Sequence, residues 1–360
     1  MEHYYAMIVA GGGGTRLWPL SRSNMPKQLL PLVEDHSMFK ISVERLAPLF
    51  TPDRIYVVTG PKYVDLMRED APEIPSQNFI VEPYGKESGP AAALGIAVIQ
   101  QRDPQATIAI LTADHHISDK EGFRAVLAAA RDLAQQGYIV TLGIAPTLPS
   151  TGFGYIRQGG ELDQIHGLNC YQSLGFTEKP NAEKTAEFLA SGAYSWNSGM
   201  FVWTAQQAMS EFQRQQPEMY AQFMQLAPTV DTPEFNTTLD TVWENVKKIS
   251  LDYAVMEGAE RVAVIPVEIG WNDIGSWASL FEVLPLDQTG NTIKGSAPES
   301  LKLDTRNTLV VSDKLVVTIG VENLVVIETP DAILICHKDR TQEVKEVVNQ
   351  LRAANKDQYL

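Results

Sequence analysis

The alternation of short β-rich runs with helical segments over roughly the first 285 residues most constrains the fold. Near-continuous Val, Ile and Leu runs are typical of strands covered on both faces. The predicted strands are Tyr5–Ala10, Arg54–Thr59, Phe79–Glu82, Thr107–Thr112, Tyr138–Ile144, Tyr171–Thr177, Met200–Thr204 and Val262–Val267. The alternation predicts an α/β fold with a doubly wound, mostly parallel sheet, in which ligands bind beyond the carboxyl ends of the strands.

Capping signals place helices between these strands. Ser118 and Glu121 have the spacing of a capping box ahead of a helix over Phe123–Gln136. Asn181 can cap a helix over Ala182–Ala190.

From about Leu286 the pattern changes to short β-branched runs with no helix between them. These runs are Leu309–Ser312, Leu315–Thr318, Leu324–Ile327 and Ile333–Cys336. Their repetition predicts a small solenoid-like or meandering β unit. A terminal helix follows, with one apolar face formed by Val344, Val347, Val348 and Leu351. We therefore expect an α/β domain over residues 1–285 and a β unit with a terminal helix over 286–360.

The charge balance excludes two classes of partner. Lys and Arg total 29 and Asp and Glu total 44, so the formal net charge is −15. Nucleic acid and anionic membranes demand a dominant basic surface, which this composition does not supply. No apolar stretch approaches the roughly 20 residues that span a bilayer, and no signal peptide is apparent. With only Cys170 and Cys336, a disulfide scaffold is not expected, so we predict a cytoplasmic protein.

A run of glycines, Gly11 to Gly14, directly follows the first predicted strand. Glycines allow the backbone to approach a ligand closely and to point N–H groups at oxyanions, although a mobile turn would have the same composition. Two known phosphate loops do not fit. The Gly-Lys-Ser/Thr of a P-loop is missing, and Leu17 stands where the dinucleotide fingerprint has its third glycine.

Charge favours the anion-binding interpretation. Between Gly11 and Val33 the charged residues are Arg16, Arg22 and Lys27, with no Asp or Glu. Arg16 offers a planar fork of donors and Lys27 a movable point charge. Together they could neutralise a triphosphate or a departing pyrophosphate. Arg22 could instead be a surface residue, so the anion-binding interpretation depends on Arg16 and Lys27.

Two aspartates are candidate metal ligands. Asp114 ends a predicted strand, and Asp273 lies in a loop rich in Gly and Trp. Two carboxylates from distant segments leave room for water and substrate phosphates, the usual arrangement around Mg²⁺. The alternatives are an N-cap or loop acid for Asp114 and a backbone-bonded loop acid for Asp273. Asp114-His115-His116 also resembles metal-dependent phosphoesterases, although no second His/Asp cluster accompanies it.

Four residues near other predicted strand ends are candidates for a sugar phosphate. Lys179 could hold a monophosphate, Glu178 could accept hydrogen bonds from sugar hydroxyls, and Asn197 offers a neutral amide. Gly154 lies in a turn that permits close approach. The alternatives are a plain turn at Gly154, a surface ion pair at Glu178 and Lys179, and a capped strand entry at Asn197.

Glu82 ends the predicted strand Phe79–Glu82. A carboxylate accepts two hydrogen bonds side by side, which matches the adjacent N1–H and N2 donors of guanine and not the edge of adenine. Glu82 is therefore a candidate for guanine selection. Its alternative is a surface ion pair with Lys86.

Seven ordered motifs, spread over nearly the whole chain, carry a family resemblance. They are Gly-Gly-Gly-Gly-Thr-Arg-Leu-Trp-Pro-Leu-Ser-Arg (11–22), Pro-Lys-Gln (26–28), Thr-Ala-Asp-His (112–115), Glu-Lys-Pro (178–180), Asn-Ser-Gly-Met-Phe (197–201), Ser-Leu-Asp-Tyr-Ala-Val-Met-Glu (250–257) and Trp-Asn-Asp-Ile-Gly-Ser-Trp (271–277). Together they resemble the mannose-1-phosphate guanylyltransferases, or GDP-mannose pyrophosphorylases, a family of sugar nucleotidyltransferases.

The resemblance implies a nucleotide-diphosphosugar transferase, GT-A-like α/β domain followed by a short β-helix-like unit. It implies transfer of GMP from GTP to mannose 1-phosphate, with Mg²⁺ and release of pyrophosphate. Implied catalytic residues are Arg16, Lys27, Asp114 and Asp273, the two aspartates also binding metal. Implied nucleotide-binding residues are Ala10, Gly11, Gly12, Gly14, Thr15, Glu82, Ser88 and Gly89. Implied sugar-phosphate-binding residues are Gly154, Glu178, Lys179 and Asn197.

Other interpretations stay open from the residues alone. The enzyme could use another nucleotide or another sugar 1-phosphate, or the chain could be a non-catalytic regulatory subunit or a metal phosphoesterase. Some relatives carry a further isomerase domain, and since this chain ends at Leu360 we expect that second activity to be absent. The solenoid-like tail is a candidate contact surface for a homodimer.

Overall fold

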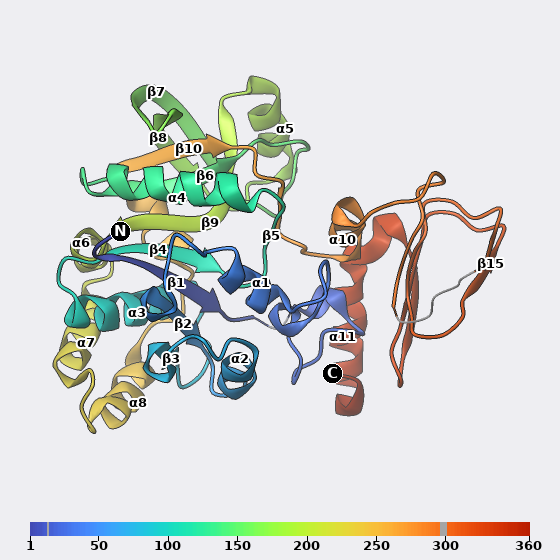
Figure 1. Cartoon of the computed structure of the whole chain (residues 1–360), viewed down its shortest axis with the longest axis horizontal. Coiled ribbons are helices and arrows are strands. Elements are labelled where there is room, and N and C mark those ends of the chain that lie inside the picture. The colour runs from blue at the N-terminus through green and yellow to red at the C-terminus, as the bar shows by residue number, and fades with distance from the viewer. Residues whose placement is uncertain (13, 296–300) are drawn as a thin grey trace. The chain divides into compact units, whose positions relative to one another are not determined.

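The computed structural model describes residues 1–12, 14–295 and 301–360. Within this part the chain forms two compact units, each assembled from segments far apart in sequence (Figure 1). The first unit comprises Met1–Gly11, Val43–Ala113 and Ile117–Trp271. The second unit comprises Gly12–Ser42, Asp114–His116 and Asn272–Leu360. The N-terminal segment therefore divides between the units immediately after Gly11.

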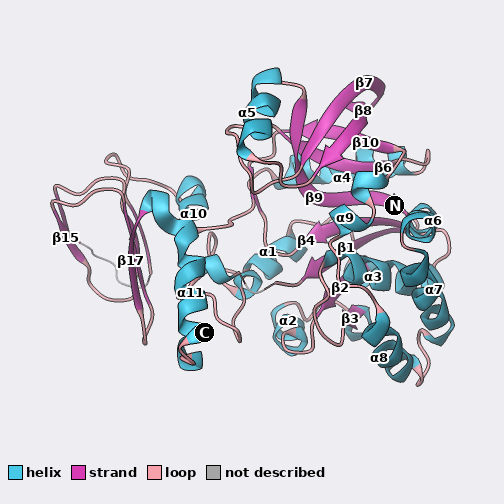
Figure 2. Cartoon of the chain, turned by 180° about the vertical axis from the view of Figure 1, so that it is seen from behind, coloured by secondary structure: helices cyan, strands magenta, loops and turns pink. Residues whose placement is uncertain are grey.

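The first unit is built on a nine-stranded sheet with the order β3-β2-β1-β4-β9-β6-β10-β8-β7 (Figure 2). Its strands are β1 (Tyr4–Ala10), β2 (Ile55–Thr59), β3 (Phe79–Val81), β4 (Thr107–Thr112), β6 (Ile139–Ile144), β7 (Tyr155–Ile165), β8 (Leu168–Thr177), β9 (Tyr194–Thr204) and β10 (Val262–Val267). Neighbours among β1 to β4 pair in parallel, as do β6 and β10. β9 runs against both β4 and β6. The prediction of a mostly parallel sheet is confirmed.

Helices cover both faces of this sheet, as a doubly wound fold requires. The helices of the unit are α2 (Val64–Asp70), α3 (Ser88–Arg102), α4 (Lys120–Ala134), α5 (Ala182–Ser191), α6 (Ala205–Gln215), α7 (Pro217–Leu226), α8 (Phe235–Asn245) and α9 (Leu251–Ala254). One apolar cluster joins α3, α6, α7 and α8 to buried strand residues such as Ile108 and Trp203. α4 packs on β4, β6 and β9 and places fully buried Phe123 and Leu127 against them.

Two local predictions need correction. Asp119, not Ser118, caps α4, because its carboxylate accepts the Gly122 N–H at 2.8 Å. Asn197 lies inside β9 rather than at its entry, since the strand already begins at Tyr194. In contrast, the predicted Asn181 cap on α5 is confirmed by its bond to the Lys184 N–H at 3.0 Å.

The second unit contains short strands arranged as a coil. One sheet contains β12 (Thr292–Lys294), β14 (Leu309–Val311), β16 (Leu324–Glu328) and β17 (Ile333–His337). Another contains β13 (Leu301–Leu303) and β15 (Val317–Ile319). From β12 to β16, successive strands alternate between the two sheets, with parallel pairing from coil to coil. The predicted solenoid-like unit is confirmed, and each coil contributes one strand to each of the two sheets. α10 (Trp277–Val283) and α11 (Val344–Ala353) accompany these strands, and α1 (Met38–Glu44) straddles the boundary between the units. A further two-stranded sheet pairs β5 (His116–Ile117) with β11 (Trp271–Asn272).

The core of the second unit joins the N-terminal segment to the end of the chain. Leu17, Trp18 and Met38 belong to one buried cluster with Trp277 of α10 and Val344 of α11. The Trp277 indole N–H donates to the Trp18 carbonyl at 3.0 Å, and the Trp18 indole N–H donates to the Tyr359 carbonyl at 2.7 Å. The glycine-run segment is thus anchored by residues about 260 and 340 positions later in the chain.

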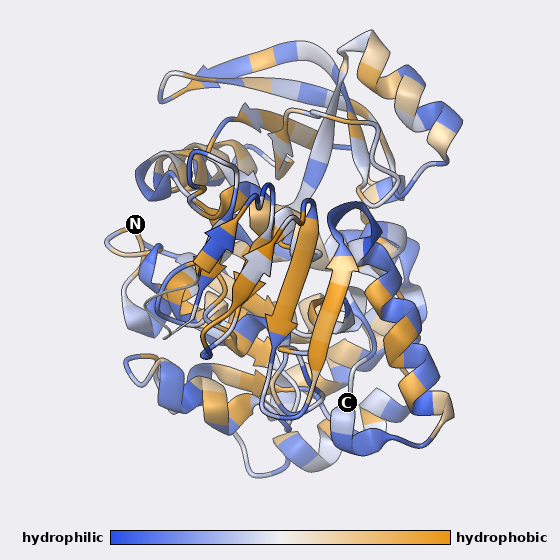
Figure 3. Cartoon of the chain, turned by 90° about the vertical axis from the view of Figure 1, so that its right-hand side faces the viewer, coloured by the Kyte–Doolittle hydropathy of each residue, from blue (hydrophilic) through white to orange (hydrophobic). Residues whose placement is uncertain are grey.

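Hydrophobic residues are concentrated in the short strands of the coil (Figure 3). Leu301, Leu303, Val317 and Ile319, paired across β13 and β15, are between 52% and 63% exposed. Within the described ranges, no helix is both long enough and apolar enough to cross a membrane. Cys170 and Cys336 are both free thiols.

Replacing Trp277 tests the core that joins the two ends of the chain. Trp277 is fully buried, so Trp277→Ala removes a large apolar side chain and leaves a cavity that costs about 3–5 kcal/mol of stability. We expect a clear loss of thermal stability. Leu286→Ala, at a residue that is 48% exposed, is the control and should melt close to the parent. Equal melting of Trp277→Ala and the parent would show that this core does not stabilise the unit.

Candidate active site

A buried lysine organises the candidate phosphate site of the second unit. Lys27 is 6% exposed, lies in a short 3₁₀ turn, Lys27–Leu29, and donates from Nζ to Asp114 Oδ2 at 2.8 Å. The same ammonium also donates to the main-chain carbonyl of Asp273. Three of the predicted catalytic residues, from three distant segments, therefore meet around one positive charge.

The electrostatics of this cluster keep Asp114 ionised. Burial alone would raise the pKa of the Asp114 carboxyl, but the Lys27 ammonium and His115 lower it below its ordinary value. Asp114 lies in the loop between β4 and β5 and does not cap α4, which is capped by Asp119, and its carboxylate pairs with Lys27. A carboxylate that stays charged at neutral pH can bind a cation.

The loop that carries Asp273 is bonded to itself. Asp273 Oδ1 accepts the Gly275 N–H at 3.1 Å, and Asn272 Oδ1 accepts the Ile274 N–H at 2.8 Å. Ile274 is fully buried and has φ +46°, a left-handed conformation that a β-branched residue rarely adopts. Asp273 is therefore a loop acid bonded to its own backbone through Oδ1, as the alternative predicted. Its main-chain carbonyl also accepts from Lys27, so Asp273 stays a candidate site residue.

The glycine run packs directly against Lys27. A Cβ at Gly14 would lie 2.4 Å from Lys27 Cβ, and Gly14 has φ +57°, so both space and backbone conformation require glycine there. Gly11 and Gly12 have open space around them, and Gly13 lies outside the described residues. Thr15 and Arg16 follow in a 3₁₀ turn, Thr15–Leu17.

The two arginines of this stretch have different surroundings. Arg16 is exposed and donates to Gln342 Oε1 at 3.1 Å, so its side chain is not part of the Lys27 cluster in this structure. Arg22 donates to Asp331 at 2.7 Å and stacks on Trp18. Arg22 therefore has a structural role, and only Arg16 keeps an accessible guanidinium.

The candidate base site lies in the first unit, at the carboxyl end of β3. Ala10 ends β1, and its carbonyl accepts the Thr59 hydroxyl at 3.0 Å. Glu82 follows β3, is 7% exposed, and its Oε2 is buried without a hydrogen-bond partner. Burial raises the pKa of the Glu82 carboxyl to about 7. The Glu82–Lys86 ion pair is not formed, because the Lys86 ammonium donates to three main-chain carbonyls instead.

Ser88 and Gly89 begin α3 and bond to the chain around residue 250. Ser88 Oγ accepts the Leu251 N–H at 2.9 Å, and the Gly89 N–H donates to the Ile249 carbonyl at 3.0 Å. A Cβ at Gly89 would approach that carbonyl to 2.6 Å. Residue 89 must therefore be glycine, because the chain at Ile249 passes close to its backbone.

The predicted sugar-site residues also gather within the first unit. A Cβ at Gly154 would lie 2.5 Å from Glu178 Oε2 and 3.3 Å from Asn197 Cβ, so these three residues abut. Lys179 donates to Glu178 Oε1 and has φ +45°. Burial tends to lower the pKa of Lys179, but the Glu178 carboxylate raises it overall. Asn197 sits at an irregularity where β9 slips against β6, a feature that redirects side chains near functional sites.

Asp252 is a member of this cluster to which the sequence assigned no role. Asn197 Nδ2 donates to Asp252 Oδ1 at 3.0 Å, and burial, with the nearby Glu178 charge, raises the pKa of Asp252 to about 6. The sequence held one signal for this residue. Asp252 lies two positions after Ser250, which caps α9, within the motif 250–257. A second buried carboxyl thus accompanies Glu178.

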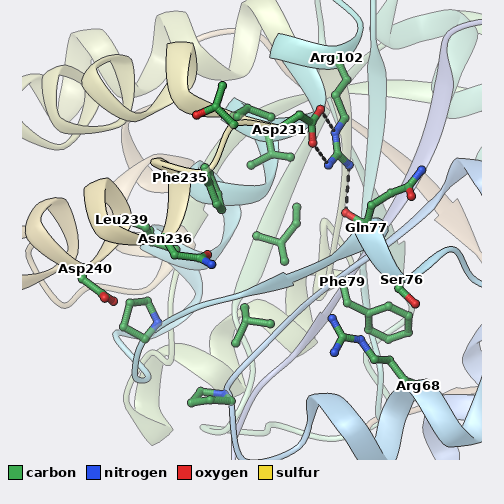
Figure 4. Close-up of a pocket in the computed structure, with 17 residues that line it drawn as sticks. Arg68, Ser76, Gln77, Phe79, Arg102, Asp231, Phe235, Asn236, Leu239 and Asp240 are labelled. Carbon is green, nitrogen blue, oxygen red and sulfur yellow. Dashed lines mark hydrogen bonds and ion pairs between the residues drawn. The ribbon is translucent and has the colours of Figure 1, made fainter.

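A separate cavity of about 710 Å³ lies beside β3 in the first unit (Figure 4). Its lining mixes apolar side chains such as Phe79, Phe235 and Leu239 with the ion pair of Arg102 and Asp231. None of the predicted site residues lines it. The predicted site residues of this unit therefore lie outside this cavity.

Comparison with known proteins supplies the family. The Nucleotidyl transferase family model matches residues 5–290, and the MannoseP isomerase/GMP-like beta-helix domain model matches residues 299–351. The chain belongs to the nucleotidyl transferase family. The mannose-1-phosphate guanylyltransferase of Escherichia coli K12 is 35% identical over 366 residues, which cover 99% of this chain and 75% of the relative. The alginate biosynthesis protein AlgA of Pseudomonas aeruginosa is 36% identical, covering 98% of this chain and 73% of the relative.

A solved structure agrees with this nucleotidyltransferase over its whole length. The crystal structure of mannose-1-phosphate geranyltransferase from Thermus thermophilus superposes with a TM-score of 0.88 at 35% identity, covering 97% of this chain and 99% of that one. The mannose-6-phosphate isomerase structure from Helicobacter pylori covers 75% of this chain with a TM-score of 0.61 at 26% identity. The α/β domain with a β-helix-like continuation is therefore shared with solved relatives.

The residues present suit a divalent metal ion that also binds substrate. Among the described residues, no group of three or more His, Cys, Asp or Glu side chains is arranged to hold a metal. Mg²⁺ usually takes only one or two carboxylates and completes its shell with water and substrate phosphates. The ionised Asp114 carboxylate and the nearby Asp273 are hard oxygen donors of the kind that such a site uses.

Glu82 generates a prediction about stability and pH. With its folded pKa raised, the carboxyl is neutral in the folded protein below pH 7 and ionised, at a cost, above it. Stability from this group is therefore fully present below the ordinary glutamate pKa of about 4.5 and is lost between there and pH 7. Glu82→Gln should stabilise the protein at pH 8.5 by about 3 kcal/mol and at pH 5 by less than about 1 kcal/mol.

Thermal denaturation at the two pH values measures this difference. Glu87→Gln is the matched control, because Glu87 lies on the same loop with a side chain that is 48% exposed. The control should show no such pH-dependent gain. A Glu82→Gln protein that melts below the parent at both pH values would contradict the burial argument.

Proposed function

We propose that this nucleotidyltransferase transfers GMP from GTP to mannose 1-phosphate, giving GDP-mannose and pyrophosphate. The names of its relatives support mannose 1-phosphate as the acceptor. The observation that carries the reaction type is the buried Lys27 ammonium between Asp114 and the Asp273 backbone. A buried cation beside an ionised carboxylate suits the handling of polyphosphate and metal.

In-line attack needs no activated side chain. An ionised oxygen of mannose 1-phosphate forms a bond to the α-phosphorus of GTP, and the bond from that phosphorus to the bridging oxygen of the β-phosphate breaks. The leaving group departs as pyrophosphate. Alignment and charge neutralisation then supply most of the catalysis.

Charge neutralisation falls to the residues of the second unit in this proposal. Lys27 and the accessible Arg16 would bind the triphosphate and the leaving pyrophosphate, with Gly12, Gly14 and Thr15 offering backbone N–H groups. Asp114 and Asp273 would hold Mg²⁺, which when bound neutralises phosphate oxygens and orients them for displacement.

Selection of base and sugar falls to the first unit. We assign Glu82, with Ala10, Gly11, Ser88 and Gly89, to the guanosine part of GTP, because its buried and unpartnered oxygen suits adjacent N–H donors. The sugar hydroxyls are assigned to Glu178, Asn197 and Gly154, and the sugar phosphate to Lys179. The abutting arrangement of these four residues supports the assignment.

We propose three further properties of the chain. Residues 1–285 form the nucleotidyltransferase domain and residues 286–360 the β-helix-like unit with its terminal helix. The protein acts in the cytoplasm.

It is a homodimer through the exposed apolar side chains of β13 and β15, whose burial against a second copy would remove apolar surface from water. Sedimentation at micromolar concentration tests the dimer, and a monomer there would exclude it.

A substrate panel tests the proposed reaction against its alternatives. Pyrophosphate release is measured with GTP, ATP, UTP and dTTP, each with mannose 1-phosphate, glucose 1-phosphate or no sugar, and with and without Mg²⁺. We expect release only with GTP, mannose 1-phosphate and Mg²⁺ together. Preference for another pair would redefine the substrates. Phosphate release without a sugar would indicate a phosphoesterase, and inactivity throughout would indicate a regulatory subunit.

The Lys27 cluster yields the main catalytic prediction. Lys27→Ala and Asp273→Ala each remove one contact to a charge that develops during transfer, so kcat should fall by about 10²–10³, while both variants remain folded. Circular dichroism and steady-state pyrophosphate release measure the two effects. Asp304→Asn, in an exposed turn, is the control and should retain full turnover. Near-parental rates in either cluster variant would remove it from the catalytic set.

A further inference from the structure

The ammonium of Lys86 is buried at the carboxyl end of α8. Lys86 is 9% exposed, and its Nζ donates to the carbonyls of Trp243, of Glu244 at 3.1 Å and of Val246 at 2.6 Å. A lysine ammonium has three donors, and here each has an acceptor. The last carbonyls of a helix lack helical partners and carry its negative dipole end. Lys86 therefore caps α8 from a distant loop.

That loop is the one that begins with Glu82 and ends with Ser88. It is joined to residues 243–251 by bonds other than those of the ammonium. The Trp243 indole N–H donates to the Tyr84 carbonyl at 2.8 Å, and the Ile249 N–H donates to the Lys86 carbonyl at 3.3 Å. The loop and the segment after α8 thus hold each other in place.

The backbone of the loop cannot keep its shape unaided. Glu87, next to Lys86, has φ 70° and ψ −177°, a region that is essentially restricted to glycine and is tolerated only where surrounding contacts enforce it. The Lys86 contacts provide that enforcement on one side, and the Ser88 and Gly89 bonds provide it on the other.

We infer that Lys86 is a positioning residue for base recognition, which fixes the Glu82–Ser88 loop to the end of α8 so that the Glu82 carboxylate faces the guanine. This inference rests on the proposed function, in which Glu82 selects guanine. Lys86 itself touches neither substrate. Its loss should weaken GTP binding and base discrimination, while the phosphate chemistry assigned to Lys27, Asp114 and Asp273 is left intact.

Lys86→Met tests this with steady-state kinetics. The methionine is unbranched and only one heavy atom shorter than lysine, and it removes the donors. We expect KM for GTP to rise by about tenfold or more, with kcat within about threefold of the parent, and the preference for GTP over ATP to fall. Lys248→Met is the matched control, because Lys248 is a nearby lysine with a 66% exposed side chain, and it should leave all three quantities unchanged.

A double-substitution cycle separates positioning from general support. If Lys86 acts through Glu82, then Lys86→Met adds little to the loss of GTP preference already caused by Glu82→Gln, since residues of one unit are not additive. A fully additive effect, an unchanged KM for GTP, or a loss confined to kcat or thermal stability would overturn the inference.

If Lys86→Met fails to fold, Lys86→Arg is measured instead. A guanidinium cannot converge on the same point, so KM for GTP should again rise, and an unchanged value would overturn the inference.

The failure of each proposal has its own result. If Glu82→Gln alone leaves the preference for GTP unchanged, the assignment of Glu82 to guanine is wrong. If Glu82→Gln abolishes that preference while Lys86→Met preserves it, the assignment of Glu82 stands and the role of Lys86 is wrong.

Discussion

The charge of Lys27 organises the candidate phosphate site of the second unit. A buried ammonium without partners is costly, and this one is bonded to the carboxylate of Asp114 and the backbone of Asp273. These contacts bring together the glycine-run segment, the residues after β4 and the Asp273 loop. The core formed by Trp18 and Trp277 holds the same segments together by apolar packing. Electrostatics and hydrophobic burial therefore act on one arrangement, and the proposed phosphate site is its product.

In the first unit, a different lysine has a related role. Lys86 is also buried, but its partners are carbonyls at a helix end rather than a carboxylate. This leaves the nearby Glu82 without a cation, and the pKa of Glu82 rises as a result of burial. A carboxyl that is kept dry and unpaired is costly to stability, yet it retains its acceptors for a ligand. The separation of Lys86 from Glu82 is what makes a base-reading role for Glu82 physically reasonable.

Backbone strain lies beside each of the proposed sites. Ile274 follows Asp273, Lys179 follows Glu178, and Glu87 precedes Ser88, and all three have positive φ. Such residues persist only where surrounding contacts determine the backbone. No sequence pattern in this chain indicated these conformations, because none of the three is a glycine or an asparagine. All three lie next to candidate site residues, so the fold accepts a conformational cost at these positions.

The sequence by itself determined the layer architecture, the coiled C-terminal unit and the identity of most candidate site residues. Apolar runs, caps and local charge are readable from neighbours along the chain, as with Asn181 before α5 and the acid-free stretch around Lys27. Only the tertiary structure decided which partners those residues meet. It paired Arg22 with Asp331, separated Glu82 from Lys86, added Asp252 to Asn197, and assigned the glycine run after Gly11 to the unit of the C-terminus. The reason is that these contacts join residues tens to hundreds of positions apart, where burial and competing hydrogen-bond partners, rather than local pattern, set the energy.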